Sequence, residues 1–343
     1  MNSNVYAVLL AGGKGTRLWP LSTPSFSKSF ISIGKRKPLI AETINRLSGF
    51  ILKKNIIIVV DKAQEGHLKR FVKGIPRRNI LVEPFGRSTA SAVGLAAIAL
   101  RSENVMVVLP TDARLENIAG FKKAIKRAIN FASKPNPSLI CVGIKPREAK
   151  TAYGYIKVGP RPKDGIYSID KFIEKPKKSL ALELVKSANN LWNAGMFIFK
   201  AKDILGAIKK HAPRLHRELE IIKKSKSKKE AAYSRMRNVS IDYQIMERAC
   251  NLFCVKGDFY WHDLGSWKMV GELLKRDKYG NVSFGSTNLM DTEGTLVYNT
   301  QKKHIGVVGL KDIVVVNTEN GVLVCNKKYA EKVKELAGGL KIK

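Results

Sequence analysis

The sequence contains little cysteine and no long apolar run. Its 343 residues include only four cysteines, at positions 141, 250, 254 and 325. So few cysteines in a chain of this length exclude a disulfide scaffold and indicate reduced, buried thiols, and no second Cys or His pair completes a zinc pattern with Cys250 and Cys254. No apolar stretch reaches the roughly 18 residues of a transmembrane helix, and the apolar segment 5–11 is too short for a signal peptide. These absences predict a soluble, cytoplasmic protein with no membrane partner.

Acidic residues are also scarce. The chain has 28 Asp and Glu against 62 Lys and Arg, which gives a net charge of +34. Such a surplus attracts polyanions, so nucleic acid, anionic membranes and phosphorylated small molecules are candidate partners. The basic residues are spread along the chain, and the only dense run, 223–229, is typical of a solvated helix face or loop. A nucleic-acid-binding protein would instead cluster basic residues with stacking aromatics, so no specific nucleic-acid partner is expected.

Strand-length apolar runs alternate with helical segments over the first ~145 residues, the pattern of a doubly wound α/β sheet. Continuous apolar runs are typical of strands that are buried on both faces. The expected strands cover residues 5–10, 55–60, 80–82, 105–109 and 138–143. The expected helices cover residues 38–48, 65–72, 88–102 and 119–132.

The pattern changes after residue 150 and again near residue 280. The middle part is expected to hold strands at 153–158, 166–174, 196–199 and 252–256. Its helices are expected at 179–187, across 202–219, at 240–247 and after residue 261. The last part has short apolar segments at 295–298, 305–308, 313–316 and 322–324, and a helical segment at 329–336. Short β segments without long helices between them predict a small β domain that is closed by a helix.

A glycine-rich loop follows the first strand directly. Its spacing matches neither a Walker loop nor a dinucleotide-binding fingerprint. Glycines after a buried strand let backbone N–H groups approach a phosphate, and nearby cations supply the charge that a triphosphate requires. Those cations are Lys14, Arg17 and Lys28. The loop therefore predicts a triphosphate-binding site.

Two aspartates and three other polar residues suggest a metal and a sugar. Asp112 follows the strand 105–109 at its carboxyl end, where ligands of open α/β sheets bind, and Asp263 lies in an aromatic-flanked turn. Either carboxylate alone is more often a turn former, but two together suit one Mg²⁺ between phosphates. Glu174, Lys175 and Asn193 offer groups that donate to and accept from vicinal hydroxyls.

These residues fall within a family resemblance. The segment 10–30, LAGGKGTRLWPLSTPSFSKSF, resembles the signature of sugar nucleotidyltransferases. Its Trp19-Pro20-Leu21-Ser22 variant is similar to that of mannose-1-phosphate guanylyltransferases in particular. Matching blocks then follow in the family's order over nearly the whole chain, at 83–90, 153–155, 172–176, 191–197, 240–243 and 263–267.

The resemblance implies a fold and a division into domains. The fold would be a Rossmann-like, doubly wound mixed sheet of the GT-A-like nucleotidyltransferase type. The catalytic domain would span residues 1–280, and a short left-handed β-helix domain with a closing helix would span residues 281–343. Longer relatives continue into an isomerase domain, so isomerase activity is not expected. The resemblance leaves open whether the protein forms a homodimer.

The resemblance also implies a reaction and its residues. The enzyme would transfer GMP from GTP to α-D-mannose 1-phosphate with Mg²⁺ as cofactor, giving GDP-mannose and pyrophosphate. Arg17 and Lys28 would be catalytic, and Asp112 and Asp263 would bind the metal. The nucleotide would be bound by Leu10, Ala11, Gly12, Gly13, Lys14, Gly15, Thr16, Glu83, Gly86, Arg87, Ser88, Thr89 and Pro110. The sugar would be bound by Gly154, Glu174, Lys175, Asn193 and Gly195.

Four positions depart from the family pattern. Ser27 stands where proline is usual, Ser29 where glutamine is usual, Ser88 where asparagine is usual and Ala113 where histidine is usual.

Three alternative functions remain beside transfer of GMP to mannose 1-phosphate. One is the same chemistry on another sugar 1-phosphate or nucleotide, such as glucose 1-phosphate. The others are a catalytically silent regulatory relative and a basic nucleic-acid-binding protein. Retention of Lys28 and of both aspartates favours catalysis.

Overall fold

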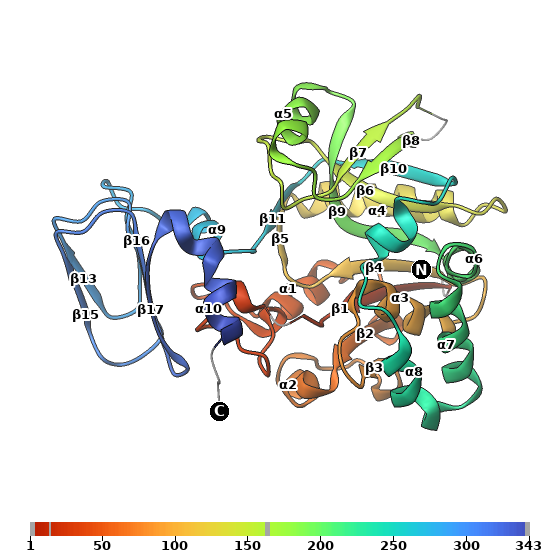
Figure 1. Cartoon of the computed structure of the whole chain (residues 1–343), viewed down its shortest axis with the longest axis horizontal. Helices are drawn as coiled ribbons and strands as arrows, with labels where there is room; N and C mark the ends of the chain where they lie inside the picture. The colour runs from red at the N-terminus through yellow and green to blue at the C-terminus, as the bar shows by residue number, and fades with distance from the viewer. Residues whose placement is uncertain (1–3, 14, 162–164, 340–343) are drawn as a thin grey trace.

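A nine-stranded mixed sheet forms the centre of the larger part of the molecule (Figure 1). The structure is a computed structural model that describes residues 4–13, 15–161 and 165–339. The strand order is β3-β2-β1-β4-β9-β6-β10-β8-β7, and β7 also pairs with β9. The strands are β1 (Val5–Leu10), β2 (Ile56–Asp61), β3 (Ile80–Glu83), β4 (Val105–Pro110), β6 (Leu139–Ile144), β7 (Tyr155–Val158), β8 (Ile166–Ile173), β9 (Asn190–Lys200) and β10 (Leu252–Gly257).

Helices cover both faces of this sheet, which confirms the doubly wound prediction. On β1, Ala7 and Leu9 point to one apolar core and Val8 points to the other, because successive side chains of a strand alternate between faces. One core includes side chains of α1 (Leu39–Arg46), α2 (Glu65–Phe71) and α4 (Ile118–Ala132). The other includes side chains of α3 (Ser88–Ile98), α6 (Ala201–His211), α7 (Pro213–Lys224) and α8 (Lys229–Arg235).

Helix α3 lies between the sheet and a second layer of helices, which explains its small side chains. A Cβ added at Gly94 would meet Leu219 of α7 at 2.5 Å, so the two helices approach too closely for a larger residue. The helix ends at Ile98 and does not reach residue 102 as predicted. A turn replaces its last residues, because the Arg101 amide donates to the Asn104 side chain at 2.9 Å.

The part of the chain from β9 to β10 differs from the sequence prediction in two places, a strand and a helix. β9 is much longer than the predicted 196–199 because its length pairs in turn with β4, β6 and β7. The predicted helices across 202–219 are α6 and α7, and α7 begins at Pro213, since proline suits the first turn but not a helix interior. The predicted helix at 240–247 is one short π-helical segment, η8 (Asp242–Met246). The predicted 179–187 helix is α5 (Lys178–Lys186).

The smaller part is a stack of short strands, seen at the left of Figure 1. Its strands are β12 (Val282–Phe284), β13 (Thr287–Met290), β14 (Leu296–Asn299), β15 (Ile305–Val308), β16 (Ile313–Thr318) and β17 (Gly321–Asn326). β12, β14 and β16 are parallel, so that Val282, Leu296 and Val314 stack in one register. This parallel stacking is β-helix-like, as expected. The predicted closing helix is a 3₁₀ segment, η9 (Lys327–Lys332), followed by α10 (Val333–Gly339).

The cysteines are all free, but they are not all buried. Cys141 and Cys254 lie in the sheet core, whereas Cys325 is partly buried and Cys250 is exposed. Cys250 follows η8 in the turn before β10, outside the packed strands, so the prediction of buried thiols was wrong for this residue. Within the described ranges, no helix has both the length and the apolar character needed to cross a membrane.

Candidate active site

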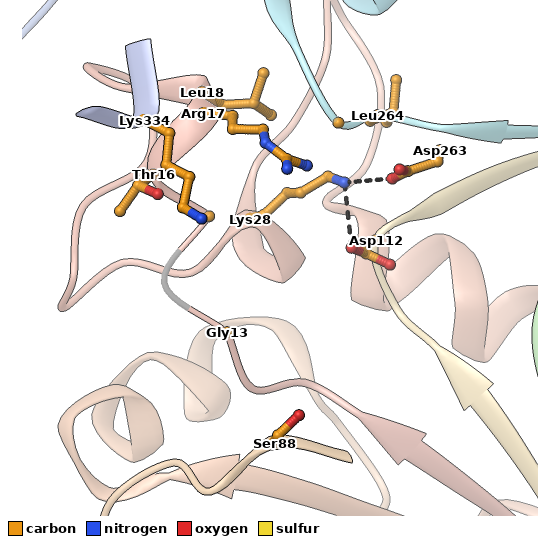
Figure 2. A pocket seen from close by; sticks show the side chains of 12 residues that line it. Gly13, Thr16, Arg17, Leu18, Lys28, Ser88, Asp112, Asp263, Leu264 and Lys334 are labelled. Atoms are coloured by element: carbon orange, nitrogen blue, oxygen red, sulfur yellow. Dashed lines mark hydrogen bonds and ion pairs between the residues drawn. The ribbon is translucent and has the colours of Figure 1, made fainter. Parts of the chain in front are cut away.

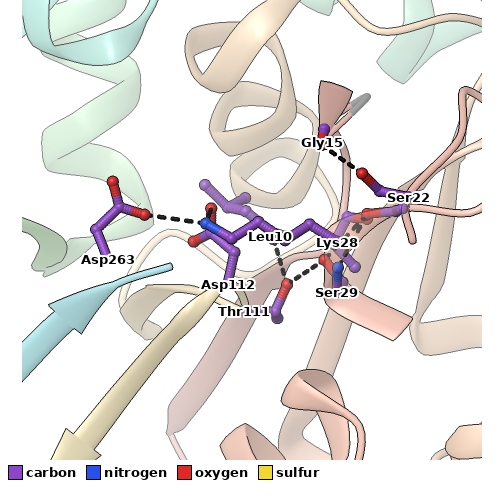
Figure 3. A network of polar contacts seen from close by, with 10 residues as sticks. Leu10, Gly15, Ser22, Lys28, Ser29, Thr111, Asp112 and Asp263 are labelled. Atoms are coloured by element: carbon purple, nitrogen blue, oxygen red, sulfur yellow. Dashed lines mark hydrogen bonds and ion pairs between the residues drawn. The ribbon is translucent and has the colours of Figure 1, made fainter. Parts of the chain in front are cut away.

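Lys28 is held between two carboxylates at the centre of the candidate site (Figures 2 and 3). Its Nζ donates to Asp112 Oδ2 at 3.2 Å and to Asp263 Oδ1 at 3.0 Å. The lysine is buried, with 8% of its surface exposed. Burial alone would lower the pKa of Lys28, but the charges and hydrogen bonds of the two aspartates raise it above its ordinary value. The ammonium group is therefore firmly charged.

Two strands that the sequence analysis did not predict bring the aspartates together. Asp112 lies between β4 and β5 (Ala113–Glu116), and Asp263 ends β11 (Tyr260–Asp263). β5 and β11 pair antiparallel, with Ala113 opposite Asp263. Residues that are far apart along the chain are thus fixed beside one lysine.

Buried hydroxyl groups tie the Lys28 segment to the ends of two strands (Figure 3). The Ser29 and Thr111 hydroxyls lie 2.7 Å apart, and the Thr111 hydroxyl donates to the Leu10 carbonyl at 2.9 Å. The Ser27 side chain accepts the Ser29 amide at 3.2 Å and caps the 3₁₀ turn η2 (Lys28–Phe30). Two of the four departures from the family pattern, Ser27 and Ser29, therefore help to position Lys28.

Lys28 lines a cleft with a volume of about 580 Å³, and many of the predicted phosphate-binding residues line the same cleft. Figure 2 shows it between the glycine loop, Ser88 and the two aspartates. The predicted residues that line it are Gly13, Gly15, Thr16, Arg17, Lys28, Ser88, Asp112 and Asp263. Leu18, Leu264, Gly265 and Lys334 also line it. Lys14 lies outside the described residues.

The other predicted nucleotide residues lie around the cleft but do not line it. Leu10, Ala11, Gly12 and Pro110 lie at the ends of β1 and β4, whose last residues, Leu10 and Pro110, are register partners. The Gly86 amide donates to Asp61 at 2.9 Å. The Arg87 guanidinium donates to the backbone carbonyls of Tyr233 and Ser234, so it anchors α8. The Thr89 hydroxyl accepts the Ile241 amide at 2.9 Å.

Glu83 is the buried carboxyl group of this region. It ends β3, its Oε2 would lie 3.8 Å from a Cβ on Gly12, and only 4% of its surface is exposed. Burial, with a further contribution from the Asp61 charge, raises the pKa of Glu83 to about 7, although hydrogen bonds and Lys229 partly oppose the shift. The folded protein thus binds this proton more tightly than the unfolded chain does.

Replacing Glu83 with glutamine should change stability in a pH-dependent way. The wild type loses stability as pH rises from about 4.5 to 7, because ionisation is easier in the unfolded chain. The variant should therefore be more stable than wild type at pH 8, by about 3 kcal/mol, and the gain should shrink towards pH 5. Urea unfolding at both pH values measures it. The exposed Glu230→Gln variant should show no such trend, and a pH-independent difference for Glu83→Gln would contradict the prediction.

The predicted sugar-binding residues form a second polar cluster. Lys175 Nζ lies 2.7 Å from Glu174 Oε1, and the backbone N–H of Asn193 donates to the Gly154 carbonyl at 2.8 Å. The Gly195 amide donates to the Asn193 side chain at 3.0 Å. Asp242 accepts from Asn193 Nδ2 at 2.8 Å. Burial raises the pKa of Glu174 to about 6, with a further contribution from the Asp242 charge, and Lys175 opposes the shift.

The sequence analysis missed two residues that contribute to these sites. Asp242 lies in the matching block 240–243 but received no role, although its hydrogen bond with Asn193 makes it part of the second polar cluster. Lys334 lines the cleft beside Lys28 from α10, and nothing in its local sequence distinguishes it from the other exposed lysines of a basic chain. Only the packing of the smaller part on the larger one reveals it.

That packing centres on Trp19 and Pro20 of the signature segment. Trp267 Nε1 donates to the Trp19 carbonyl at 2.9 Å, and Thr318 and Asn320 donate to the Pro20 carbonyl at 3.0 and 3.2 Å. The Trp19 ring would touch a Cβ on Gly321 at 3.1 Å. The Trp-Pro pair is therefore an anchor for the β-helix-like part.

A glycine loop at a strand end, a buried lysine and two facing carboxylates define a site for handling nucleotide phosphates. The chain belongs to the nucleotidyl transferase family, because the model of the family described as "Nucleotidyl transferase" matches residues 6–278. A second family, described as "MannoseP isomerase/GMP-like beta-helix domain", matches residues 286–340. The fold is thus a mixed α/β nucleotidyltransferase fold with a β-helix-like C-terminal part.

Named relatives point to one enzyme within this family. The chain is 35% identical to a protein of Vibrio cholerae serotype O1 that is provisionally named a mannose-1-phosphate guanylyltransferase, over 97% of this chain and 74% of that protein. It is 31% identical to the mannose-1-phosphate guanylyltransferase of Escherichia coli, over 98% of this chain and 75% of that enzyme. A crystal structure of a Thermus thermophilus protein, described as mannose-1-phosphate geranyltransferase, is similar with a TM-score of 0.87 at 30% identity, and the match covers 98% of both chains.

Proposed function

We propose that this protein transfers GMP from GTP to α-D-mannose 1-phosphate, giving GDP-mannose and pyrophosphate. The observation that carries the proposal is Lys28, buried between Asp112 and Asp263 in a cleft lined by the glycine loop. This arrangement supports nucleotidyl transfer, and the names of the relatives support mannose and guanine. A cytoplasmic location is part of the proposal, since free thiols are typical of a reducing compartment.

The proposed reaction is an in-line displacement at phosphorus. A phosphate oxygen of the sugar phosphate attacks the α-phosphorus of GTP, and a new P–O bond forms. The bond from the α-phosphorus to the oxygen bridging to the β-phosphate breaks, and pyrophosphate leaves with its electron pair. Both reactants are already anionic, so no strong base is needed. Lys28 and Arg17 would align the phosphates and stabilise their charge.

The two aspartates fit the Mg²⁺ that we propose as cofactor. Both place a carboxylate oxygen within 3.2 Å of the same ammonium nitrogen, so a cation is already accommodated between them. In the described part of the chain no group of three or more metal-ligating side chains occurs. Mg²⁺ suits such a sparse set, because it is commonly held by one or two carboxylates together with substrate phosphates and water. When bound there, it would neutralise phosphate charge.

We also propose that the chain divides at residues 280 and 281 into a catalytic domain and a β-helix domain. The nine-stranded sheet uses strands up to β10, and β12 to β17 pair only with one another. The domains would not act separately, because the signature segment carries the Trp19 and Pro20 anchor.

Pyrophosphate release by purified protein with Mg²⁺ tests the proposed function. GTP with mannose 1-phosphate should release pyrophosphate faster than any other pair in a panel of nucleoside triphosphates and sugar 1-phosphates. A preference for glucose 1-phosphate would replace mannose and keep the reaction class. Absence of release with every pair would refute the proposal.

Replacing Gly154 with alanine should weaken sugar binding selectively. An added Cβ would clash with Glu174 Oε2 and would lie 3.3 Å from Asn193 Cβ, so both proposed sugar ligands would be displaced. The KM for mannose 1-phosphate should rise about tenfold or more, while the KM for GTP stays nearly constant. Steady-state kinetics with each substrate varied in turn measure the two KM values. Gly206→Ala, at an open helical position, is the control. An equal rise in both KM values would contradict the assignment of Gly154 to the sugar site.

A further inference from the structure

The closing helix α10 packs against the signature segment. Val333 and Ala337, one turn apart on α10, are buried in the same apolar cluster as Leu18 and Trp19. Figure 1 shows α10 between the two parts of the molecule. This packing fixes the position of the intervening residues of the helix relative to the glycine loop.

Lys334 follows Val333 and lines the phosphate cleft. Figure 2 shows its side chain extending from α10 towards Thr16 and the glycine loop, well away from Ser88. The cleft's other described cations are both paired: Lys28 with two aspartates, and Arg17 with Glu331, whose Oε2 lies 3.5 Å from Arg17 Nε. Among the residues that the structure describes, Lys334 is the lining cation without a carboxylate partner. A polyphosphate entering the cleft would meet this charge unneutralised.

We propose that Lys334 of the β-helix domain binds the two phosphates of GTP that leave as pyrophosphate. The inference rests on the proposed function and on the order of groups along the cleft. Lys28 and the two aspartates mark the reacting phosphate, and Ser88 marks the nucleoside side that the family resemblance implies. Lys334 lies on the opposite side of the glycine loop from Ser88 (Figure 2), where the terminal phosphates would extend. The β-helix domain thereby contributes a substrate-binding residue to the catalytic domain.

The assignment gives the closing segment a chemical role besides a structural one. A lysine acts on phosphate as a point charge with three donors, and its long side chain can follow a moving ligand. Glu331, in the preceding turn, pairs with Arg17, so the same segment also holds a second cation that lines the cleft. Docking of the β-helix domain is therefore expected to be needed for pyrophosphate binding.

Kinetics in both directions test the role of Lys334 with a matched control. Lys334→Gln should raise the KM for GTP about tenfold in the forward direction, the effect of losing one charge-assisted phosphate contact. In the reverse direction the KM for pyrophosphate should rise similarly, while the KM for GDP-mannose changes by less than about twofold, because that product lacks the terminal phosphates. Lys334→Arg should retain most of the affinity. Lys332→Gln removes the same charge from an exposed residue beside Tyr329 and should behave as wild type.

Three results would overturn the assignment. Equal pyrophosphate KM values for Lys334→Gln and Lys332→Gln would show that the contact is absent. A parallel rise in the KM for GDP-mannose would show a general loss of the site, as would a fall in the thermal midpoint of Lys334→Gln alone. Failure of the proposed function is distinguishable, since a wild type without transferase activity can still be titrated with pyrophosphate by calorimetry. Weaker binding by Lys334→Gln than by Lys332→Gln in that titration would still support the phosphate contact.

Discussion

Replacing Lys28 with methionine is expected to lower kcat for GDP-mannose formation about a thousandfold, with a much smaller change in the KM for mannose 1-phosphate. Methionine keeps most of the side-chain volume but removes the charge. Charge develops on the phosphates during transfer, and a prepositioned donor in a buried site typically contributes a factor of about 100 to 1,000. Lys28 should lie at the upper end, because its loss also leaves Asp112 and Asp263 facing each other without the cation between them.

That second effect gives an independent measurement for Lys28. Lys28 competes with a metal ion for the two carboxylates, so Lys28→Met should bind Mg²⁺ more tightly than wild type in the absence of nucleotide. Isothermal titration with MgCl₂ measures this, and pyrophosphate release measures kcat. Lys35→Met changes an exposed lysine shortly after the signature segment, and it should change neither the Mg²⁺ affinity nor kcat. A variant at Lys28 that keeps more than about a tenth of wild-type kcat would contradict a catalytic role.

Asp263→Asn is expected to lower activity by a similar factor of about a thousand at a fixed millimolar Mg²⁺ concentration. The substitution keeps the shape of the side chain and removes one of the two carboxylates that line the cleft in the described part of the chain. An amide oxygen is a much weaker Mg²⁺ ligand than a carboxylate, and the loss of one negative charge also lowers the site's attraction for the cation. Activity should therefore recover in part as Mg²⁺ is raised, whereas wild-type activity should already be saturated.

The control for Asp263 is Asp258→Asn, which changes an exposed carboxylate just before the same strand, β11. Its activity should equal that of wild type at every Mg²⁺ concentration. Near-normal turnover of Asp263→Asn would remove this residue as a metal ligand. A loss that no Mg²⁺ concentration reduces would assign Asp263 to the positioning of Lys28 alone.

Most of the central sheet could be predicted from local pattern. The runs at β1, β2 and β4 are apolar without interruption because both faces of these strands are buried, and each observed strand lies within a residue or two of its prediction. Phosphate chemistry was also predictable, since a glycine loop at a strand end limits what the backbone can contact. These features depend on residues that are neighbours along the chain.

Other features could not be predicted because they depend on pairing between distant segments. The strands β5 and β11 are four residues each and have no strong apolar pattern, so their stability depends on their mutual hydrogen bonding and on the packing of Leu115 and Trp261 against the sheet core. Asp263 was therefore predicted to lie in a turn, although the strand that it ends is what places it beside Lys28. In the same way, β9 extends to Asn190 because β7 lies beside its first residues.

The sequence alone determined the fold class and the order of the elements, and it predicted phosphate binding at the glycine loop, because each follows from short-range periodicity and backbone chemistry. It also showed a Trp-Pro variant in the signature, which resemblance connected with mannose. The tertiary structure decided what that variant does: the Pro20 carbonyl accepts hydrogen bonds from Thr318 and Asn320 of the β-helix-like part, and the Trp19 ring lies against Gly321, so the pair anchors that part. It also brought Asp263 to Lys28 and Lys334 to the cleft, because contacts between residues that are far apart along the chain exist only once the two parts have packed together.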